Sequence, residues 1–247
     1  MKLEDYKVLK MLGRGGFGKV LRCQNSSTKE FYAMKILSKR SLVEMNQVEH
    51  TRAEQEILAH VNHPFLVSLE AAYMDSRNLY FVMKLMKGGE LYTHLGRKKR
   101  FDEKTTKFFA ACIVLAVSYL HANHYEYRDL KLENILMDEK GYLKLTDFGL
   151  SKYMKDMDKT HTMCGTLYYL SPEVISGEGH SYPVDWWSLG VIVFELLNGV
   201  PPFYVGSKSD RALMRIIKNG RFFFNEKVKI SKEGKDFITK VQSKIHE

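Results

Sequence analysis

Tyr127-Arg128-Asp129-Leu130-Lys131-Leu132-Glu133-Asn134 is the run of residues that narrows the architecture of this chain most, and Asp147-Phe148-Gly149 follows it at a short distance. The two runs combine a carboxylate that can accept a hydroxyl proton, a lysine that can neutralise an anion, and an Asn and an Asp that can ligate divalent cations. Phosphoryl transfer from Mg-ATP needs these groups, because it depends mainly on positioning and charge neutralisation. One such run can arise by chance, so its meaning depends on whether related elements precede it.

A glycine-rich element lies near the N-terminus. It reads Gly13-Arg14-Gly15-Gly16-Phe17-Gly18-Lys19-Val20 and fits G-x-G-x-x-G-x-V, which alone is a weak signal. A dinucleotide-binding fold would need a helix after the glycines, whereas two β-rich runs, 20–23 and 31–37, follow around a turn. We expect a hairpin whose glycines permit close backbone approach and positive φ, and which covers phosphates. Lys35 occupies the lysine position of a V-A-I-K motif, written Tyr-Ala-Met-Lys here.

A helical pattern occupies residues 41–60. Ala53, Ile57 and Leu58 recur at three- and four-residue spacing, and Glu54 shares the face of Leu58. By itself Glu54 is as readily a solvated glutamate, like its neighbour Glu56.

Taken together, these elements resemble the catalytic domain of eukaryotic protein kinases over nearly all of residues 5–240. Tyr127 in place of histidine and the runs 162–166, 184–190 and 201–203 (Thr-Met-Cys-Gly-Thr, Val-Asp-Trp-Trp-Ser-Leu-Gly and Pro-Pro-Phe) resemble the AGC group, which includes cyclic-nucleotide-dependent kinases, protein kinase C and Akt. Lys131 together with Thr166 is similar to serine/threonine kinases rather than tyrosine kinases.

The resemblance implies an α+β, two-lobed kinase fold: a small N-lobe (1–83) with an antiparallel sheet and one helix, a hinge (84–89), and a larger, mainly helical C-lobe (90–247) that is incomplete at its C-terminus. It also implies ATP and Mg²⁺ as cofactors. Each apolar residue assigned below to the adenine pocket would otherwise be taken for ordinary core, so the assignment depends on the motif alignment alone.

The same resemblance assigns roles to individual residues. Asp129 would accept the proton of the substrate hydroxyl, and Lys131 would neutralise the γ-phosphate. Asn134 and Asp147 would hold two Mg²⁺ ions, and Lys35, paired with Glu54, would hold the α- and β-phosphates. The remaining residues expected around ATP are Leu12, Gly13, Gly15, Gly16, Phe17, Gly18, Val20, Ala33, Met83, Lys84, Met86, Glu90, Leu136 and Thr146.

Regulation follows from the same alignment. Thr162 matches the threonine that AGC kinases carry phosphorylated, either by an upstream kinase or by autophosphorylation. His50, Arg128 and Lys152 match the cationic cage for that phosphate, which would order residues 150–170. Without the alignment, Thr160 and Thr162 would be ordinary polar loop residues.

Substrate preference is also implied. Glu90 and Glu133 match the carboxylates with which AGC kinases recognise an arginine N-terminal to the acceptor, and Thr166 lies where the substrate peptide docks. We therefore expect protein substrates with basic residues before the Ser or Thr. Arg215 falls where some relatives have a further acidic residue. Whether the kinase also recognises a second basic residue of the substrate is therefore left open.

The chain departs from the family pattern at several positions. Leu167 replaces a proline, Ser171-Pro172-Glu173 replaces Ala-Pro-Glu, and the arginine that usually pairs with Glu173 is missing. Lys240 or Lys244 could substitute for that arginine. Two alternatives follow: a nucleotide-binding pseudokinase or scaffold, because the C-lobe is short, and a small-molecule phosphotransferase, which should lack Gly165-Thr166 and the Ser-Pro-Glu run.

Composition is consistent with this interpretation. A chain of 247 residues with 45% hydrophobic content can bury a substantial core, and three cysteines without C-x-x-C spacing indicate a reducing compartment. The net charge is +9, but the sequence contains no nucleic-acid-binding motif. We therefore expect a solvated basic face and no nucleic-acid partner. We find no apolar run near the length of a membrane span and no signal sequence, and therefore expect no membrane insertion and a cytoplasmic location, with the nucleus left open.

Overall fold

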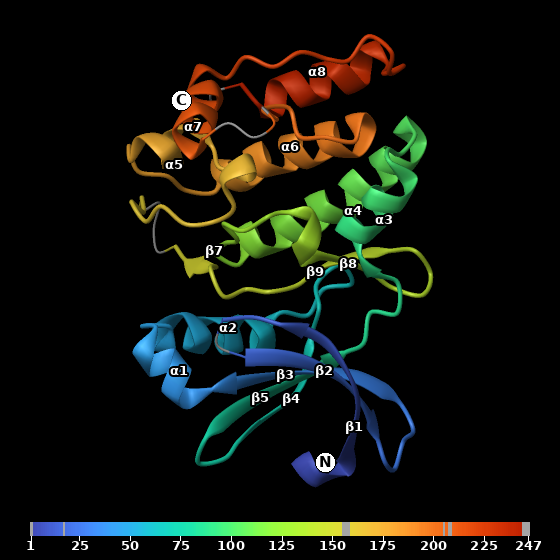
Figure 1. Cartoon of the computed structure of the whole chain (residues 1–247), viewed down its shortest axis with the longest axis vertical. Coiled ribbons are helices and arrows are strands. Elements are labelled where there is room, and N and C mark those ends of the chain that lie inside the picture. The colour runs from blue at the N-terminus through green and yellow to red at the C-terminus, as the bar shows by residue number, and fades with distance from the viewer. Residues whose placement is uncertain (1, 17, 155–158, 205, 207–208, 244–247) are drawn as a thin grey trace.

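The computed structural model describes residues 2–16, 18–154, 159–204, 206 and 209–243. Figure 1 shows two lobes, with the strands β1–β5 in one and most of the helices in the other. The expected α+β, two-lobed architecture is confirmed. Lys244, one of the two lysines suggested as a partner of Glu173, lies outside the described residues, as does Phe17 of the glycine-rich element.

The small lobe is a five-stranded antiparallel sheet in the order β1-β2-β3-β5-β4. The strands are β1 (Tyr6–Arg14), β2 (Gly18–Asn25), β3 (Phe31–Ser38), β4 (Leu69–Met74) and β5 (Asn78–Lys84), and a 3-10 turn (Leu3–Asp5) precedes them. Alternate residues of β2 and β3, including Cys23, Tyr32 and Met34, are buried in a core of their own. The glycine-rich element is therefore the β1–β2 hairpin, as expected.

Two helices accompany this sheet, where the sequence led us to expect one. A short helix α1 (Lys39–Glu44), capped by the Ser38 hydroxyl, precedes α2 (Val48–His60). Helix α2 buries Thr51, Glu54, Ile57 and Leu58. Because Glu54 shares the buried face with Ile57 and Leu58, the alternative of a solvated glutamate is wrong.

The chain crosses to the large lobe after β5. Strands β6 (Gly89–Glu90), β8 (Ile135–Met137) and β9 (Leu143–Leu145) form a three-stranded sheet, and β7 (Tyr125–Glu126) pairs with β10 (Lys152–Tyr153). The helices are α3 (Leu91–Lys98), α4 (Glu103–Ala122), α5 (Pro172–Ser176), α6 (Pro183–Asn198), α7 (Asp210–Asn219) and α8 (Lys232–Val241), with 3-10 turns at Leu132–Asn134 and Leu167–Tyr169.

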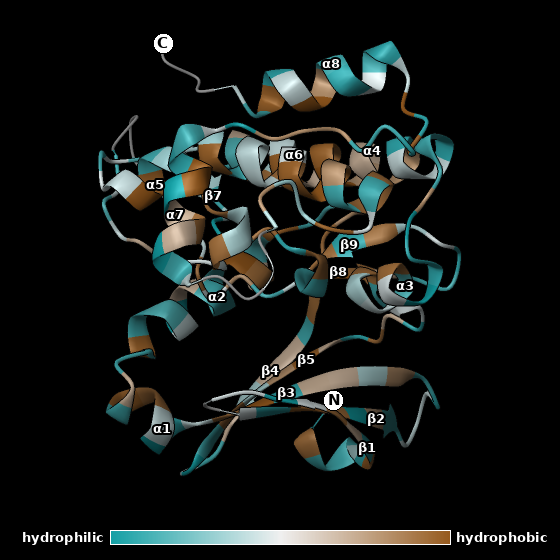
Figure 2. Cartoon of the chain, turned by 45° about the horizontal axis from the view of Figure 1, so that its top comes forward, coloured by the Kyte–Doolittle hydropathy of each residue, from teal (hydrophilic) through white to brown (hydrophobic). Residues whose placement is uncertain are grey.

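Helix α6 forms the centre of the large lobe. Nearly all of its residues from Val184 to Leu197 are buried, and it contacts α4 on one side and α8 on another. Figure 2 shows the hydrophobic character that goes with this burial concentrated on α6 and on the neighbouring part of α4. Burial of the catalytic-loop residues Leu130 and Leu132 in the same core ties the loop to this rigid element.

Helix α4 is, within the described part of the chain, long and apolar enough to cross a membrane. The sequence expectation that no segment reaches that length was therefore wrong as to length and composition. The apolar residues Phe109, Ile113, Ala116 and Val117 are buried in the large-lobe core. Its composition is thus accounted for by packing against α6 and β9.

Candidate active site

One buried aspartate of α6 binds the backbone of the catalytic loop. Asp185, at the start of α6, accepts hydrogen bonds from the backbone N–H groups of Tyr127 (2.9 Å) and Arg128 (2.8 Å), and its Oδ2 lies 2.7 Å from His121 Nε2. Arg128 adopts a left-handed backbone conformation, φ 67°, which is rare for a residue with a side chain and is characteristic of functional loops. The loop's shape is therefore imposed by α6.

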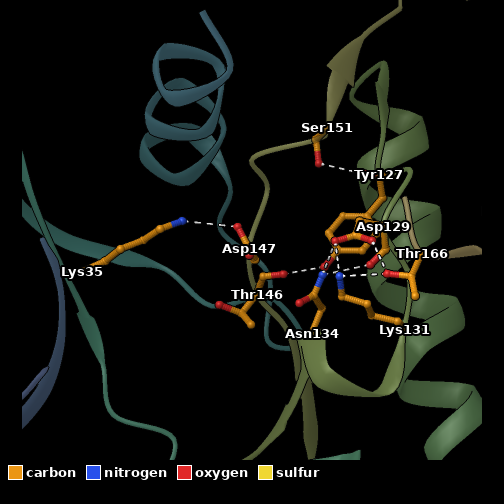
Figure 3. Close-up of polar contacts among 9 residues, drawn as sticks. All are labelled: Lys35, Tyr127, Asp129, Lys131, Asn134, Thr146, Asp147, Ser151 and Thr166. Atoms are coloured by element: carbon orange, nitrogen blue, oxygen red, sulfur yellow. Dashed lines mark hydrogen bonds and ion pairs between the residues drawn. The ribbon is translucent and has the colours of Figure 1, made fainter. Parts of the chain in front are cut away.

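Tyr127, in the position usually held by histidine, is fully buried. Its hydroxyl donates to the backbone carbonyl of Thr146, and its ring meets Phe148 edge-on with ring centroids 5.7 Å apart. Figure 3 shows Tyr127 standing between the loop and the Thr146–Asp147 segment. Tyr127 thus connects the two runs from which the sequence interpretation began.

Asp129 lies at the centre of a compact polar cluster (Figure 3). Its Oδ2 accepts from Lys131 Nζ at 2.7 Å and from Asn134 Nδ2 at 2.8 Å, while Lys131 also donates to Thr166 Oγ1 at 3.1 Å. The Thr166 hydroxyl lies 3.4 Å from Asp129 Oδ1. Burial raises the pKa of Asp129 above its ordinary value, against the hydrogen bonds from Lys131 and Asn134. A carboxylate of raised pKa is a better proton acceptor.

Lys35 is held across from this cluster. Its Nζ lies 2.6 Å from Glu54 Oε1 and 3.2 Å from Asp147 Oδ1. Burial alone would lower the pKa of Lys35, but the carboxylates of Glu54 and Asp147 outweigh it and raise that pKa. Asp147 has φ 61° and a half-exposed side chain, so its carboxylate is turned toward the open space between the lobes. The expected pairing of Lys35 with Glu54 is present.

A cavity of about 720 Å³ lies where the two lobes meet. It collects the expected ATP-binding residues Leu12, Gly13, Val20, Ala33, Lys35, Glu54, Met83, Lys84, Met86, Glu90, Leu136, Thr146 and Asp147, and the expected catalytic residues Lys131 and Asn134. Val67, Leu85 and Thr93 also line it, and the sequence interpretation missed them. Leu85 lies within the predicted hinge, whereas no motif marks Val67 or Thr93.

The remaining glycines lie at the hairpin tip. Gly15 and Gly18 line a second cavity together with Lys35, Asp129 and Asp147, and Gly16 lines a third with Arg14 and Lys19. The Gly15 N–H donates to the Gly18 carbonyl at 2.9 Å and closes the turn. A Cβ at Gly18 would lie 2.1 Å from the Ile36 carbonyl oxygen, so close strand approach requires this glycine. Gly13, Gly15, Gly16 and Gly18 are absent from the positive-φ residues of the described chain, so the freedom of glycine to adopt positive φ is not used there, whereas the close backbone approach is used at Gly18.

The three expected cage residues surround the start of the segment 150–170. The Arg128 Nε donates to the Leu150 carbonyl at 2.6 Å, and its buried Nη1 has no hydrogen-bond partner within the described residues. His50 lines a cavity with Leu150, and Lys152 is exposed in β10. Thr162 is exposed, and its backbone carbonyl oxygen lies 3.1 Å from His180 Nε2. Within the described residues, no hydrogen bond joins Thr162 to the cage residues.

The residues expected to contact a peptide lie on the rim of the site. Glu90 and Glu133 are exposed and line the interlobe cavity, and Thr166 joins the Asp129 cluster.

Glu195 of α6 was missed by the sequence interpretation, because a buried helix position carries no motif of its own. Burial, together with the charge of Glu133, raises the pKa of Glu195 to about 7, and Tyr169 OH donates to it at 2.7 Å.

Glu173, in α5, is partly buried. Lys240, suggested as its replacement partner, is instead paired with Asp236 at 2.9 Å. No ion pair to Glu173 occurs within the described residues, which leave out Lys244. Arg215, the position of the uncertain second basic determinant, is exposed on α7.

Comparison with known proteins agrees with this geometry. The family model described as "Protein kinase domain" matches residues 6–246, and the chain therefore belongs to the protein kinase family. The chain is 46% identical over 203 residues to a cAMP-dependent protein kinase catalytic subunit of Dictyostelium discoideum, covering 82% of this chain and 31% of that protein.

Two further relatives show the same group. A RAC family serine/threonine-protein kinase homolog of Dictyostelium discoideum is 47% identical over 202 residues, with 81% of this chain and 46% of that protein covered. The cAMP-dependent protein kinase type 3 of Saccharomyces cerevisiae is 44% identical over 202 residues, with 82% and 50% covered. The resemblance to AGC kinases is thus confirmed, and the matched region spans about a third to a half of the length of these relatives.

Proposed function

We propose that this chain is the catalytic domain of a serine/threonine protein kinase that transfers the γ-phosphoryl group of Mg-ATP to protein hydroxyls. One observation carries the proposal: the Asp129–Lys131–Asn134–Thr166 cluster and the Lys35–Glu54 pair face one another with Asp147 between them. No position of the catalytic set is replaced, which argues against the pseudokinase and scaffold alternatives.

The residues present fit a Mg²⁺–nucleotide group. Asn134 uses its amide nitrogen to bond Asp129, which leaves its carbonyl oxygen as a hard oxygen ligand beside the half-exposed carboxylate of Asp147. Val20, Ala33, Met83 and Leu136 give the same cavity an apolar section for a base. When bound, the metal would neutralise charge that develops on the phosphates.

The protein's own side chains would accept the proton, offset charge and position the reacting groups. Asp129 would accept the proton of the incoming hydroxyl and orient its oxygen, because its carboxylate is fixed by Lys131 and Asn134. Lys131 would offset charge on the transferred group while Lys35, fixed by Glu54, would hold the other phosphates. The hydroxyl of Thr166 lies beside Asp129 and Lys131 and would help to align the acceptor hydroxyl.

We further propose two finer properties. The exposed carboxylates of Glu90 and Glu133, with Glu195 close to Glu133, would favour substrates that carry arginine before the acceptor. Phosphorylation at Thr162 would supply an anion for Arg128, whose Nη1 is buried and unpartnered within the described residues, and for His50 and Lys152.

The test uses an Arg-x-x-Ser peptide, Mg-ATP and the Thr162-phosphorylated protein, beside the Asp129→Asn variant and the exposed control Asp102→Asn. We expect transfer that falls by about a thousandfold in Asp129→Asn and is unchanged in the control, since a positioned proton acceptor contributes about 10²–10⁴-fold. Nucleotide binding measured by calorimetry should survive in all three proteins. Binding without transfer in the unsubstituted protein would instead establish a nucleotide-binding scaffold.

A further inference from the structure

His180, in the loop between α5 and α6, joins two distant segments through its side chain. Its imidazole is only 3% exposed. Nδ1 lies 2.9 Å from Glu126 Oε1, and Nε2 lies 3.1 Å from the backbone carbonyl oxygen of Thr162. The backbone adds two bonds, from Thr160 N–H to the His180 carbonyl (2.9 Å) and from His180 N–H to the Thr160 carbonyl (2.8 Å). His180 therefore fixes the stretch that contains the proposed phosphorylation site.

Glu126 connects this contact to the catalytic loop. It ends β7, is fully buried, and directly precedes Tyr127-Arg128-Asp129. Its backbone pairs with Lys152 of β10. Its Oε2 is buried without a hydrogen-bond partner, and within the described residues His180 is the hydrogen-bond partner of its side chain. A charged Glu126 is thus balanced mainly by His180.

The geometry fixes how many protons this pair must hold. Both neighbours of the imidazole, a carboxyl oxygen and a peptide carbonyl oxygen, are acceptors, whereas a neutral imidazole has one donor and one acceptor nitrogen. Both contacts are satisfied when imidazolium faces carboxylate, or when a protonated Glu126 donates to Nδ1 and Nε2–H donates to Thr162. In either form the pair holds one titratable proton and is neutral overall.

Removing that proton breaks one of the two contacts. The imidazole then turns a lone pair either toward the Glu126 carboxylate or toward the Thr162 carbonyl, and a net negative charge is left buried, which is costly. Two nearby acidic groups do not change this charge near neutral pH, because burial raises the pKa of the Cys164 thiol and of the Tyr182 phenol and keeps both groups neutral.

The side chains of the other charged or titratable groups around the pair form no hydrogen bond with it within the described residues, although Arg128 keeps a buried Nη1 without a partner there. Arg128 donates through Nε to Leu150, Lys152 turns its side chain to solvent, and His161 is exposed beside Gly179 with its Nδ1 facing the Gly177 carbonyl.

We propose that His180 is a positioning residue that, together with Glu126, forms a proton-dependent clasp holding Thr160–Thr162 against the strand that leads into the catalytic loop. The clasp is closed while the pair holds its proton, and it loosens as the pH rises and the proton is lost. It acts on the segment before any phosphate is attached to Thr162. The clasp is defined by side-chain and backbone contacts, so it stands independently of the phosphoryl-transfer proposal.

The substitution Glu126→Gln separates the role of the proton from the role of the contacts. A glutamine at 126 can donate its amide N–H to Nδ1 while neutral His180 donates Nε2–H to Thr162, so the clasp closes without any titratable proton. His180→Phe fills the space but removes both contacts. Glu139→Gln, at an exposed glutamate paired with Lys87, changes the net charge equally and serves as the control.

The measurement is amide hydrogen exchange of residues 160–163 by mass spectrometry between pH 6 and 9, on unphosphorylated protein without nucleotide. Intrinsic exchange rates cancel when proteins are compared at the same pH. We expect the unsubstituted protein and Glu139→Gln to exchange as slowly as Glu126→Gln at low pH and about tenfold faster at high pH, the effect of losing about one hydrogen bond. His180→Phe should exchange fast throughout.

A ratio between the unsubstituted protein and Glu126→Gln that stays constant with pH would overturn the proposal, as would slow exchange in His180→Phe. If Glu126→Gln fails to fold, nitrogen NMR of the His180 ring in the unsubstituted protein decides. Ring signals that titrate over the pH range in which exchange accelerates support the clasp, and ring signals that remain constant over that range exclude it. These readouts need no catalysis, so a failed clasp and a failed kinase assay are distinguishable.

Discussion

Lys35 Nζ of β3 and Glu54 Oε1 of α2 lie 2.6 Å apart, so this ion pair joins the sheet of the small lobe to helix α2. Glu54 is 5% exposed, and removing one partner leaves the other charge buried and uncompensated. We expect Lys35→Met and Glu54→Gln each to lower kcat/KM by about ten- to a hundredfold, because a lost charged hydrogen bond costs about 1.5–3 kcal/mol.

The double variant distinguishes a coupled pair from two separate effects. Its loss should be close to that of the worse single variant, since the two residues act as a unit. Glu56→Gln, exposed on the same helix, is the matched control and should leave kcat/KM unchanged. Losses that multiply in the double variant would contradict the pairing as the source of the effect.

Thr162 should control activity through Arg128. Phosphorylated protein is expected to be at least tenfold more active than Thr162→Ala that mass spectrometry shows to be unmodified, because a phosphate can form one to three charge-assisted hydrogen bonds with such cations. Arg128→Leu should remove the difference between phosphorylated and unphosphorylated protein.

Thr160→Val is the control for this experiment. The Thr160 hydroxyl is buried and has no hydrogen-bond partner within the described residues, so its removal should leave the response to phosphorylation intact. Full activity of unmodified Thr162→Ala would remove Thr162 from the proposal and leave the catalytic assignment untouched.

The motifs allowed much of this site to be predicted from the sequence. Asp129, Lys131 and Asn134 are close in the chain, so their spacing alone places them on one loop, and the alignment correctly paired Lys35 with Glu54. The periodicity of the helix did not decide whether Glu54 is buried, because a glutamate on the apolar face is uncommon unless it has a partner. That partner comes from another strand, and periodicity says nothing about it.

Other features depend on tertiary contacts that no local pattern encodes. Glu195 appears in the sequence as one polar residue within an apolar helix, and its link to Tyr169 and Glu133 emerges only when α6 meets the turn Leu167–Tyr169. Glu126 likewise looks like a solvated residue until His180 covers it. The constraint on Gly18 is likewise tertiary, because a Cβ there would meet the backbone of Ile36 in the neighbouring strand.

Glu133 should determine the preference for arginine. We expect Glu133→Gln to raise KM for an Arg-x-x-Ser peptide by about tenfold with little change in kcat, because an exposed carboxylate adds to binding rather than to the chemical step. The effect should be absent with a Leu-x-x-Ser peptide. Glu178→Gln, an exposed glutamate in the α5–α6 loop, is the control. Equal KM changes for both peptides would show that Glu133 acts on the site's structure rather than on arginine.

Glu195 should make the protein's stability depend on pH. Its pKa is raised from 4.5 to about 7, first by burial and then by the charge of Glu133, while the Tyr169 hydrogen bond acts in the opposite direction. The folded protein therefore holds a proton that the unfolded chain has already released, so the free energy of unfolding falls as the pH rises from about 4.5 to about 7 and is level above that.

A shift of this size corresponds to about 3 kcal/mol. Urea unfolding at pH 5, 6, 7 and 8 should show this decline in the unsubstituted protein relative to Glu195→Gln, whose amide can still accept the Tyr169 hydrogen bond without titrating. Glu133→Gln should lower the pKa of Glu195 and move the decline to lower pH, because it removes a like charge. Parallel stability curves for the unsubstituted protein and Glu195→Gln would show that Glu195 is ionised in the fold at every pH tested.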